Sequence, residues 1–579
     1  MINLNEYKSL MLVHTIIPSG PVPTVQVADG CYPYETYYET SDRPELKYLQ
    51  FVEMENDYIK VIICPDLGGK VYSIVLKASQ KEVLFCEPIV RPVRILPRYF
   101  YVGGGIEVSF PISHSPVQTV PLSYSLKKAK DRVFVYCGEK EIKFGMNFTV
   151  EFSLGIQDHF LTQRTYFINN TATSHKWMSW SNAGVPAFPD TELHYPNGTV
   201  LEHGIELKQI NWENEGPKKQ ADIKNMTGWF WREPDCNAFG VYSEINGCGL
   251  YHVADSQNVP GIKLWSDGIG DHDAFVTQWT LSSTQCLEIQ AGPIIDQGIK
   301  DVLKPGEERC YEEFWIPSDK RLSIKGIECP KVELPEISHI PLFGYAREAQ
   351  AQLWLDVIVA WRTNDILSLP NSPRLDDNRW APSGIEDLEQ ALRWAILNCD
   401  PQDKSGWLFQ LGTLVSAHQR NEEGIKYLEA SGDDRAFVLA SRLYRRANKF
   451  EEAYKVISCI KNRVFALHPQ VVIERDRVLQ ALGWKTLAER EKWIELTSGL
   501  SDEWLIERRA ALLVDKGEYG KAKKMLESTS FHLIHQRYVR QELWNKIEDK
   551  LGLDTVTKLN WMGEDNLAQF GAYWEYTEE

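Results

Sequence analysis

The spacing of apolar residues changes partway along the chain, and this change limits the folds that the chain can adopt. In the run Asn147–Ile156 every second residue is apolar: Phe148, Val150, Phe152, Leu154 and Ile156. A period of two places these side chains on one face of a β-strand. Two shorter runs rich in Val and Ile, at residues 58–64 and 132–137, predict further strands. Asn246-Gly247, between two apolar runs, predicts a tight β-hairpin.

After about residue 345 the apolar spacing becomes three to four residues, which predicts helices at 346–362 and 385–397. Small residues then recur where paired helices would cross closely: Gly424, Ala453, Ala488 and Ala522. The last three lie 35 and 34 residues apart, close to the tetratricopeptide period of about 34 residues. The stretches Leu443–Ala453 and Leu513–Ala522 resemble the middle of that repeat, and His532–Leu551 is expected to cap the array.

These patterns predict two main regions joined by a linker. Residues 1–320 are expected to form an antiparallel β-sandwich, because many strands follow one another without intervening helices. Residues 321–344, which contain three prolines, are expected to be the linker. A helical connector is expected at 345–402 and tetratricopeptide-like repeats at 403–579.

Charge and composition exclude several classes of partner. The formal net charge of −17 repels phosphate backbones, so nucleic acid is not an expected partner. Runs of about 20 apolar residues are absent from the sequence, which excludes a membrane span, and no secretory leader is evident. The 11 cysteines include no CxxC pair, which argues against disulfide frameworks and zinc ribbons. We therefore expect a cytoplasmic protein without a bound metal or cofactor, able to form homo-oligomers through its helical tail.

A glycine-rich stretch carries the most informative chemistry. Gly103-Gly104-Gly105 is followed within the next residues by Glu107 and His114. A carboxylate and an imidazole close to exposed backbone are candidates for general acid and base. Further along, Glu288 and Gln290 alternate on a predicted strand, where polar side chains are costly unless they line a polar site.

The segment 263–273 adds a second group of candidates. It mixes Lys263 and Trp265 with three carboxylates, Asp267, Asp271 and Asp273. Hard cations prefer such oxygen ligands, so a structural cation near these three is conceivable. Aromatic rings that could stack on a sugar face crowd the region before it, among them Trp180, Trp229 and Trp231, and Asn182 offers an amide beside them.

The order of these motifs resembles a bacterial family of galactose-mutarotase-like domains of uncertain function, whose members are often fused to tetratricopeptide repeats. The motifs that carry the resemblance, over roughly residues 30–320, are Pro65–Lys70, Gly104–Glu107, Asn169–Thr171, Trp180–Asn182, Gly261–Trp265, Glu288–Gly292 and Phe314–Pro317. The resemblance implies a β-supersandwich with a sugar site on its concave face. Such a fold serves aldose epimerases and also occurs in glycoside hydrolases, so fold alone does not settle the chemistry.

Three functions remain open at this point, all with a small carbohydrate as ligand. A glycoside hydrolase, the favoured function, would use Glu107 and Glu288 as its carboxylate pair, with Asp271 or Asp273 as a substitute. An aldose 1-epimerase would use His114 with Glu288. A non-catalytic sugar-binding module would use the helical tail to dock a protein. In each case the expected sugar contacts are Trp180, Asn182, Trp229, Trp231, Lys263, Trp265 and Gln290.

Overall fold

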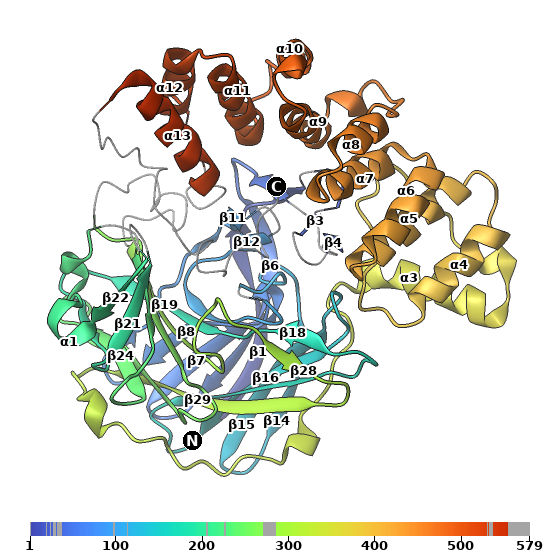
Figure 1. Cartoon of the computed structure of the whole chain (residues 1–579). Coiled ribbons are helices and arrows are strands. Elements are labelled where there is room, and N and C mark those ends of the chain that lie inside the picture. The colour runs from blue at the N-terminus through green and yellow to red at the C-terminus, as the bar shows by residue number, and fades with distance from the viewer. Residues whose placement is uncertain are drawn as a thin grey trace.

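The structure, a computed structural model, has a β region followed by a helical region (Figure 1). It describes residues 2–553 except 19, 24, 27–29, 32–36, 97–98, 113, 204–206, 225–226, 270–284, 530 and 532–536. Over these residues, no helix combines the length and the apolar character that a membrane crossing requires.

The β region is built on two large, mainly antiparallel sheets. Within the described residues the first sheet has 13 strands, in the order β10 (Ile89–Val90), β1 (Asn3–Val13), β6 (Glu45–Glu55), β7 (Ile59–Cys64), β8 (Lys70–Leu76), β13 (Gly105–Val108), β19 (Ser181–Ala187), β27 (Gln285–Gly292), β26 (Gly261–Ser266), β23 (Thr227–Trp231), β21 (Thr199–His203) and β22 (Lys208–Asn211), with β9 (Lys81–Glu82) on β8. Neighbours in the sheet such as β8 and β13 are far apart in the sequence, so long connecting segments bring distant parts of the chain together at the middle of the sheet.

The second sheet has eight strands in the described part of the chain: β14 (Ser123–Lys128), β15 (Arg132–Lys140), β16 (Asn147–Gly155), β17 (Leu161–Ile168), β29 (Glu308–Ser318), β25 (Cys248–Ala254), β24 (Ala238–Ser243) and β20 (Glu192–His194). The predicted hairpin joins β24 to β25, with Gly247 at a φ of 68°. Four small pairs complete the β region: β2 (Ile16–Pro18) with β5 (Tyr37–Thr40), β3 (Val25–Gln26) with β4 (Gly30–Cys31), β11 (Val93–Leu96) with β12 (Tyr99–Tyr101), and β18 (His175–Trp177) with β28 (Asp301–Leu303).

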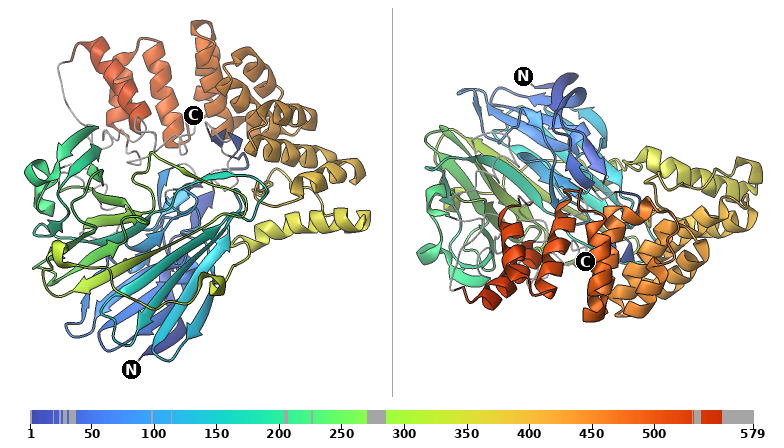
Figure 2. Two further views of the ribbon diagram at one scale, coloured as in Figure 1. Left: turned by 60° about the horizontal axis from the view of Figure 1, so that its bottom comes forward. Right: turned by 90° about the horizontal axis from the view of Figure 1, so that it is seen from above.

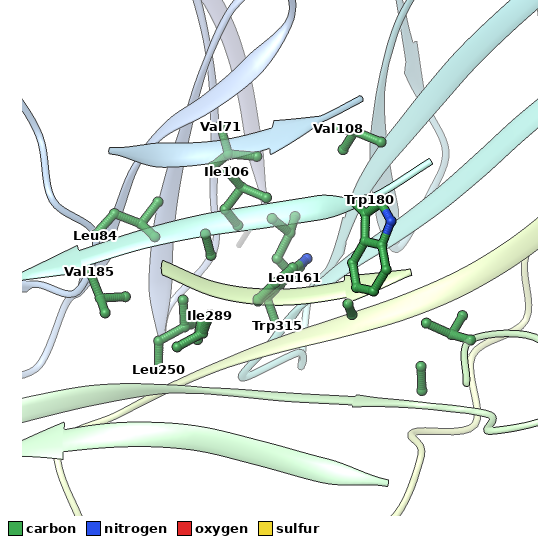
Figure 3. Packing of buried hydrophobic residues seen from close by; sticks show 14 of the residues in the cluster. Val71, Leu84, Ile106, Val108, Leu161, Trp180, Val185, Leu250, Ile289 and Trp315 are labelled. Atoms are coloured by element: carbon green, nitrogen blue, oxygen red, sulfur yellow. The ribbon is translucent and has the colours of Figure 1, made fainter. Parts of the chain in front are cut away.

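The hydrophobic core lies between the two large sheets. Ile106 and Ile289 from the first sheet pack with Leu161, Leu250 and Trp315 from the second (Figure 3). All five side chains are fully buried, and burying each one contributes roughly 1.5–3 kcal/mol. The apolar face of the predicted strand, β16, belongs to the same core.

The polar face of β16 is buried too, which its alternating pattern does not predict. Residues of the segment 321–344 cross it: Thr149 Oγ1 donates to the carbonyl of Pro341 at 2.8 Å, and Asn147 Nδ2 donates to that of Phe343 at 2.9 Å. This segment is therefore packed along the second sheet.

The helical region consists of helix pairs. Its helices are α3 (Glu348–Thr363), α4 (Leu388–Asn398), α5 (Lys404–Ala417), α6 (Asn421–Ser431), α7 (Asp434–Arg446), α8 (Phe450–Ile457), α9 (Pro469–Ala481), α10 (Leu487–Glu495), α11 (Glu503–Asp515), α12 (Tyr519–Glu527) and α13 (Arg537–Leu551); the short α1 (Trp212–Glu215) belongs to the β region. The repeated small residues lie on the second helix of each pair. A Cβ on Gly412 would come within 3.1 Å of the Gly424 carbonyl, which confirms the close crossing of α5 and α6.

The helical region arches over the first sheet, on the side away from the second sheet (Figures 1 and 2). An N-terminal segment of the chain ties the two regions together. The side-chain amide of Gln470 on α9 bonds both the N–H of Val22, at 3.3 Å, and its carbonyl, at 3.0 Å. Arg442 on α7 donates to the carbonyl of Pro23 at 2.9 Å.

Candidate active site

One face of the first sheet carries a row of polar side chains. Glu107 on β13, Asn182 on β19, Gln290 on β27 and Lys263 on β26 are cross-strand neighbours in register. Side chains alternate between the two faces of a strand, so all four lie opposite the core residues beside them. Each is buried, with at most 4% of its surface exposed.

Glu288 begins the next row on the same face. Its register partners are Gly184 on β19 and Trp265 on β26. A Cβ on Gly184 would lie 2.6 Å from the Cα of Gly104, so glycine at 184 lets the glycine-rich loop rest directly on the sheet. The predicted loop and the predicted strand acid therefore meet.

Glu288 is held by two hydrogen bonds from neighbouring side chains. The hydroxyl of Tyr101 donates to Oε1 at 2.5 Å, and the amide of Gln290 donates to Oε2 at 3.0 Å. Burial, followed by the charge of Glu288, raises the pKa of Tyr101 well above its usual range. The phenol therefore keeps its proton and acts as a donor to this carboxylate.

Glu107 and His114 form a second pair on the other side of Tyr101. Glu107 Oε1 accepts the N–H of Ser115 at 2.7 Å, and Oε2 lies 3.2 Å from His114 Nδ1. The His114 ring meets the Tyr101 ring edge-on, with centroids 5.1 Å apart. Its side chain is 21% exposed, against 5% for Glu107, so the imidazole is the more accessible member of the pair.

Lys70 on β8 completes this arrangement, and the candidate list drawn from the sequence missed it. Its ammonium donates to the carbonyls of Val102 at 2.6 Å and Gly104 at 2.7 Å. Burial lowers the pKa of Lys70, while the charge of Glu107 opposes that shift. The Gly68-Gly69-Lys70 turn was the available signal. We call Lys70, Tyr101, Glu107, His114, Glu288 and Gln290 the polar cluster.

Asn182 and Trp180 lie beside the polar cluster, and each has buried polar atoms that form no hydrogen bond within the described structure. Neither amide atom of Asn182 has a hydrogen-bond partner among the described residues, although the side chain is 4% exposed. The Trp180 ring packs against Phe230, with centroids 6.0 Å apart, and its Nε1 also has no partner in the described structure. Lys263 lies 4.9 Å above the Phe230 ring and donates to Gln297 at 2.8 Å.

Two of the predicted aromatic contacts are not brought to this face. Trp229 pairs with Leu264 in register, so it points into the core. Trp231 is fully buried and stacks on Tyr195, with centroids 4.6 Å apart. Both lie on the opposite parity of β23 from Phe230, and alternation along the strand therefore removes them from the polar face.

The remaining candidate residues are the three aspartates near which a structural cation was considered. Asp271 and Asp273, also expected as catalytic substitutes, lie outside the described residues. Asp267 is described and is buried, at 4% exposed. Within the described ranges, no three His, Cys, Asp or Glu side chains group closely enough to hold a metal ion. A structural cation near the three aspartates stays a hypothesis beside the expectation of no bound metal.

Comparison with known proteins gives the family. A family model described as a domain of unknown function, DUF5107, matches residues 26–318, just over half of the chain, and a second model, described as a C-terminal domain, matches residues 354–547. The crystal structure of a TPR-domain containing protein from Parabacteroides distasonis is 44% identical, with 97% of each chain covered and a TM-score of 0.93.

More distant solved structures match the β region alone. A putative mutarotase from Salmonella typhimurium is 9% identical over 52% of this chain and 97% of its own, with a TM-score of 0.37. A putative aldose 1-epimerase from Escherichia coli is 9% identical over 46% of this chain and 98% of its own, with a TM-score of 0.33. At this level of similarity the activities in those names do not transfer to this chain.

The expected architecture is confirmed in its main parts: a β region of two packed sheets precedes a tetratricopeptide-like helical region. The Parabacteroides protein shares it along almost its whole length. The chain therefore belongs to the family defined by the domain of unknown function DUF5107, in a form that carries a C-terminal tetratricopeptide-like region.

Proposed function

We propose that the polar cluster binds an aldose and moves protons at its anomeric centre, as an aldose 1-epimerase does. One observation carries this proposal: Tyr101 contacts both groups, because its ring meets the His114 ring edge-on and its hydroxyl donates to Glu288. Opening a pyranose ring needs one group that removes the anomeric hydroxyl proton and one that protonates the ring oxygen.

The surroundings suit a sugar. An amide that is buried with neither donor nor acceptor satisfied is costly, and Asn182 is such an amide. A sugar hydroxyl can both accept from its NH₂ and donate to its oxygen. Trp265, beside Glu288 in register, supplies the aromatic surface on which the C–H groups of a sugar face can pack.

The proton transfers balance with these two residues alone. Glu288 takes the proton of the anomeric hydroxyl, the C1–O5 bond breaks, and protonated His114 gives its proton to O5. The open-chain aldehyde rotates about C1–C2, and the reverse transfers close the ring with the other anomeric configuration. Glu107, bonded to His114 Nδ1, orients the imidazole and stabilises its charge.

Glycoside hydrolysis is the second candidate, because two buried carboxylates share one face. Their strands are separated only by β19, which puts the backbones roughly 10 Å apart. Glu107 Oε2, however, lies 3.2 Å from His114 Nδ1, and its other oxygen accepts the N–H of Ser115. Glu288 also accepts two hydrogen bonds, but from Tyr101 and Gln290, so Glu107 is the acid positioned to orient the histidine.

Polarimetry of freshly dissolved α-D-glucose and α-D-galactose tests the proposal. We expect the wild type to accelerate mutarotation and Glu288→Gln to lower that acceleration on the order of 100-fold, since a general base contributes about that much. His114→Asn should have a similar effect, and asparagine tolerates the φ of 56° at this position. Glu53→Gln is the matched control, because Glu53 on β6 lies in the same sheet, away from the polar cluster.

The alternatives predict different results. Release of reducing sugar from 4-nitrophenyl glycosides, lost in Glu107→Gln as well as Glu288→Gln, would favour the hydrolase. Sugar binding without either activity would favour a non-catalytic module. Equal mutarotation by the wild type and Glu288→Gln would contradict the proposed base.

A further inference from the structure

Asp267 is a buried acid on the sugar-facing side that the mechanism above does not use. It follows β26 directly, and alternation from Lys263 and Trp265 puts it on their face of the sheet. Ser266 pairs with Leu287, so continuing the register puts Asp267 beside Cys286, two residues beyond the pair of Trp265 and Glu288. Two residues rise roughly 6.8 Å along a strand.

The side chain of Asp267 is enclosed but incompletely bonded. It is 4% exposed, and Oδ1 has no hydrogen-bond partner among the described residues. A buried carboxyl oxygen without a partner is costly, as is the unpaired amide of Asn182 on the same face. Two such groups on one face indicate a polar ligand rather than an accident of packing.

The charge around Asp267 decides which kind of bond it can make. Burial raises the pKa of Asp267 well above its usual range, and the negative charge of Glu288 acts in the same direction. A neutral carboxylic acid has an O–H to donate, whereas a carboxylate can only accept. Next to the carboxylate of Glu288, a donor also avoids like-charge repulsion.

We propose that Asp267 donates a hydrogen bond to one hydroxyl group of the bound aldose and thereby determines which sugar is accepted; this rests on the proposed function. Glu288 then acts at the anomeric carbon, and Asp267 binds a ring hydroxyl roughly 7 Å away along the strand.

Binding of D-glucose, D-galactose and their deoxy analogues, measured by titration calorimetry, tests this role. We expect Asp267→Ala to weaken binding of the preferred sugar about 10-fold, because a sugar hydroxyl loses its partner. For one deoxy analogue the wild type and Asp267→Ala should bind equally, because the hydroxyl in question is missing. Asp267→Asn should stay within about twofold of the wild type, since an amide also donates.

A kinetic measurement separates this role from a structural one. In mutarotation assays Asp267→Ala should raise KM and leave kcat nearly unchanged, and the melting temperature of Asp267→Asn should match that of the wild type. Asp255→Ala, in an exposed turn, is the control for a lost aspartate.

Each contrary outcome has its own meaning. If Asp267→Asn and Asp267→Ala both abolish sugar binding, the site needs a carboxylate, as a cation site would. The role of Asp267 as a hydrogen-bond donor would then be wrong. Unchanged discrimination among deoxy analogues in Asp267→Ala would also overturn it. A wild type that binds none of these sugars would overturn the proposed function itself, and this inference with it.

Discussion

At the scale of single residues, Lys70 connects the fold to the site. It is the buried cation closest in the register to Glu107, and its two hydrogen bonds hold the carbonyls of the glycine-rich loop. That loop leads from Tyr101 to Glu107, so Lys70 fixes the position of both. Its charge also compensates the carboxylates of Glu107 and Glu288, which lie in a region of low dielectric constant.

Replacing Lys70 by methionine should therefore destabilise the protein by about 3 kcal/mol, since two buried carbonyls lose their donor and two carboxylates lose a countercharge. Urea unfolding measures this change. Lys60→Met, at a partly exposed position of the neighbouring strand β7, should stay near the wild type. Equal stability of Lys70→Met and wild type would show that the loop does not depend on this ammonium.

A site residue could be predicted from the sequence when a recognisable pattern lay next to it in the chain. Glu107 and His114 were identified because both follow the glycine run, and Glu288 because it alternates on a strand. Lys70 follows a pair of glycines, but that turn does not reveal its contacts, and Tyr101 carries no local pattern, because its importance comes from contacts with residues far along the chain. Trp229 and Trp231 were misplaced because composition gives the number of aromatic rings and not the face on which each one lies.

At the scale of elements, the segment around Val22 behaves as part of the helical region. The Val22 side chain is fully buried with Val438, Phe465 and Val471, and both of its backbone groups bond to Gln470. The groove between α7 and α9 is thus filled by the protein's own chain. This joins the helical region to the β region through a contact that spans 448 residues.

Gln470→Ala should lower the stability of this junction, because the N–H and the carbonyl of buried Val22 both lose their partner at about 1–3 kcal/mol each. Thermal unfolding followed by circular dichroism, together with limited proteolysis after Gly20, measures the effect. Gln402→Ala, on an exposed turn of the same region, is the control. Unchanged melting and cleavage in Gln470→Ala would mean that the apolar contact of Val22 suffices alone.

The elements themselves were largely predictable. Period-two runs became β7, β15 and β16, and the small residues at helix crossings identified the repeats. The order of strands in the sheets was not predictable, because β13, β19 and β27 are brought together by pairing across long loops. Local periodicity contains no information about such pairing.

At the scale of the whole molecule, two half-buried histidines lie where the β and helical regions meet. His175 lines a cavity of about 540 Å³ that both regions enclose, and it stacks on Phe144 with centroids 4.6 Å apart. His468, at the start of α9, lies against Gly20. Burial lowers the pKa of each to about 4, helped by neighbouring positive charges, those of His418 and Lys143 for His175 and that of Arg442 for His468.

Acid should therefore weaken the contact between the regions. Between pH 6.5 and 4 the unfolded chain binds protons that these folded-state histidines do not, so stability falls as the pH falls through this window. The control is the double variant His175→Phe with His468→Asn, in which asparagine can still cap α9. Between pH 6.5 and 4 the melting temperature of the wild type should fall by more than the melting temperature of this double variant. Parallel pH profiles of the two proteins would contradict this account.

The central claim is that the polar face of the first sheet holds a sugar with its anomeric carbon at Glu288. A crystal structure of the wild type grown or soaked with the sugar that binds best tests it most directly. We predict density for one pyranose ring within hydrogen-bond distance of Asn182 and Glu288, with the ring face on Trp265. A sugar bound elsewhere on the molecule, with the amide of Asn182 still unpaired, would contradict it.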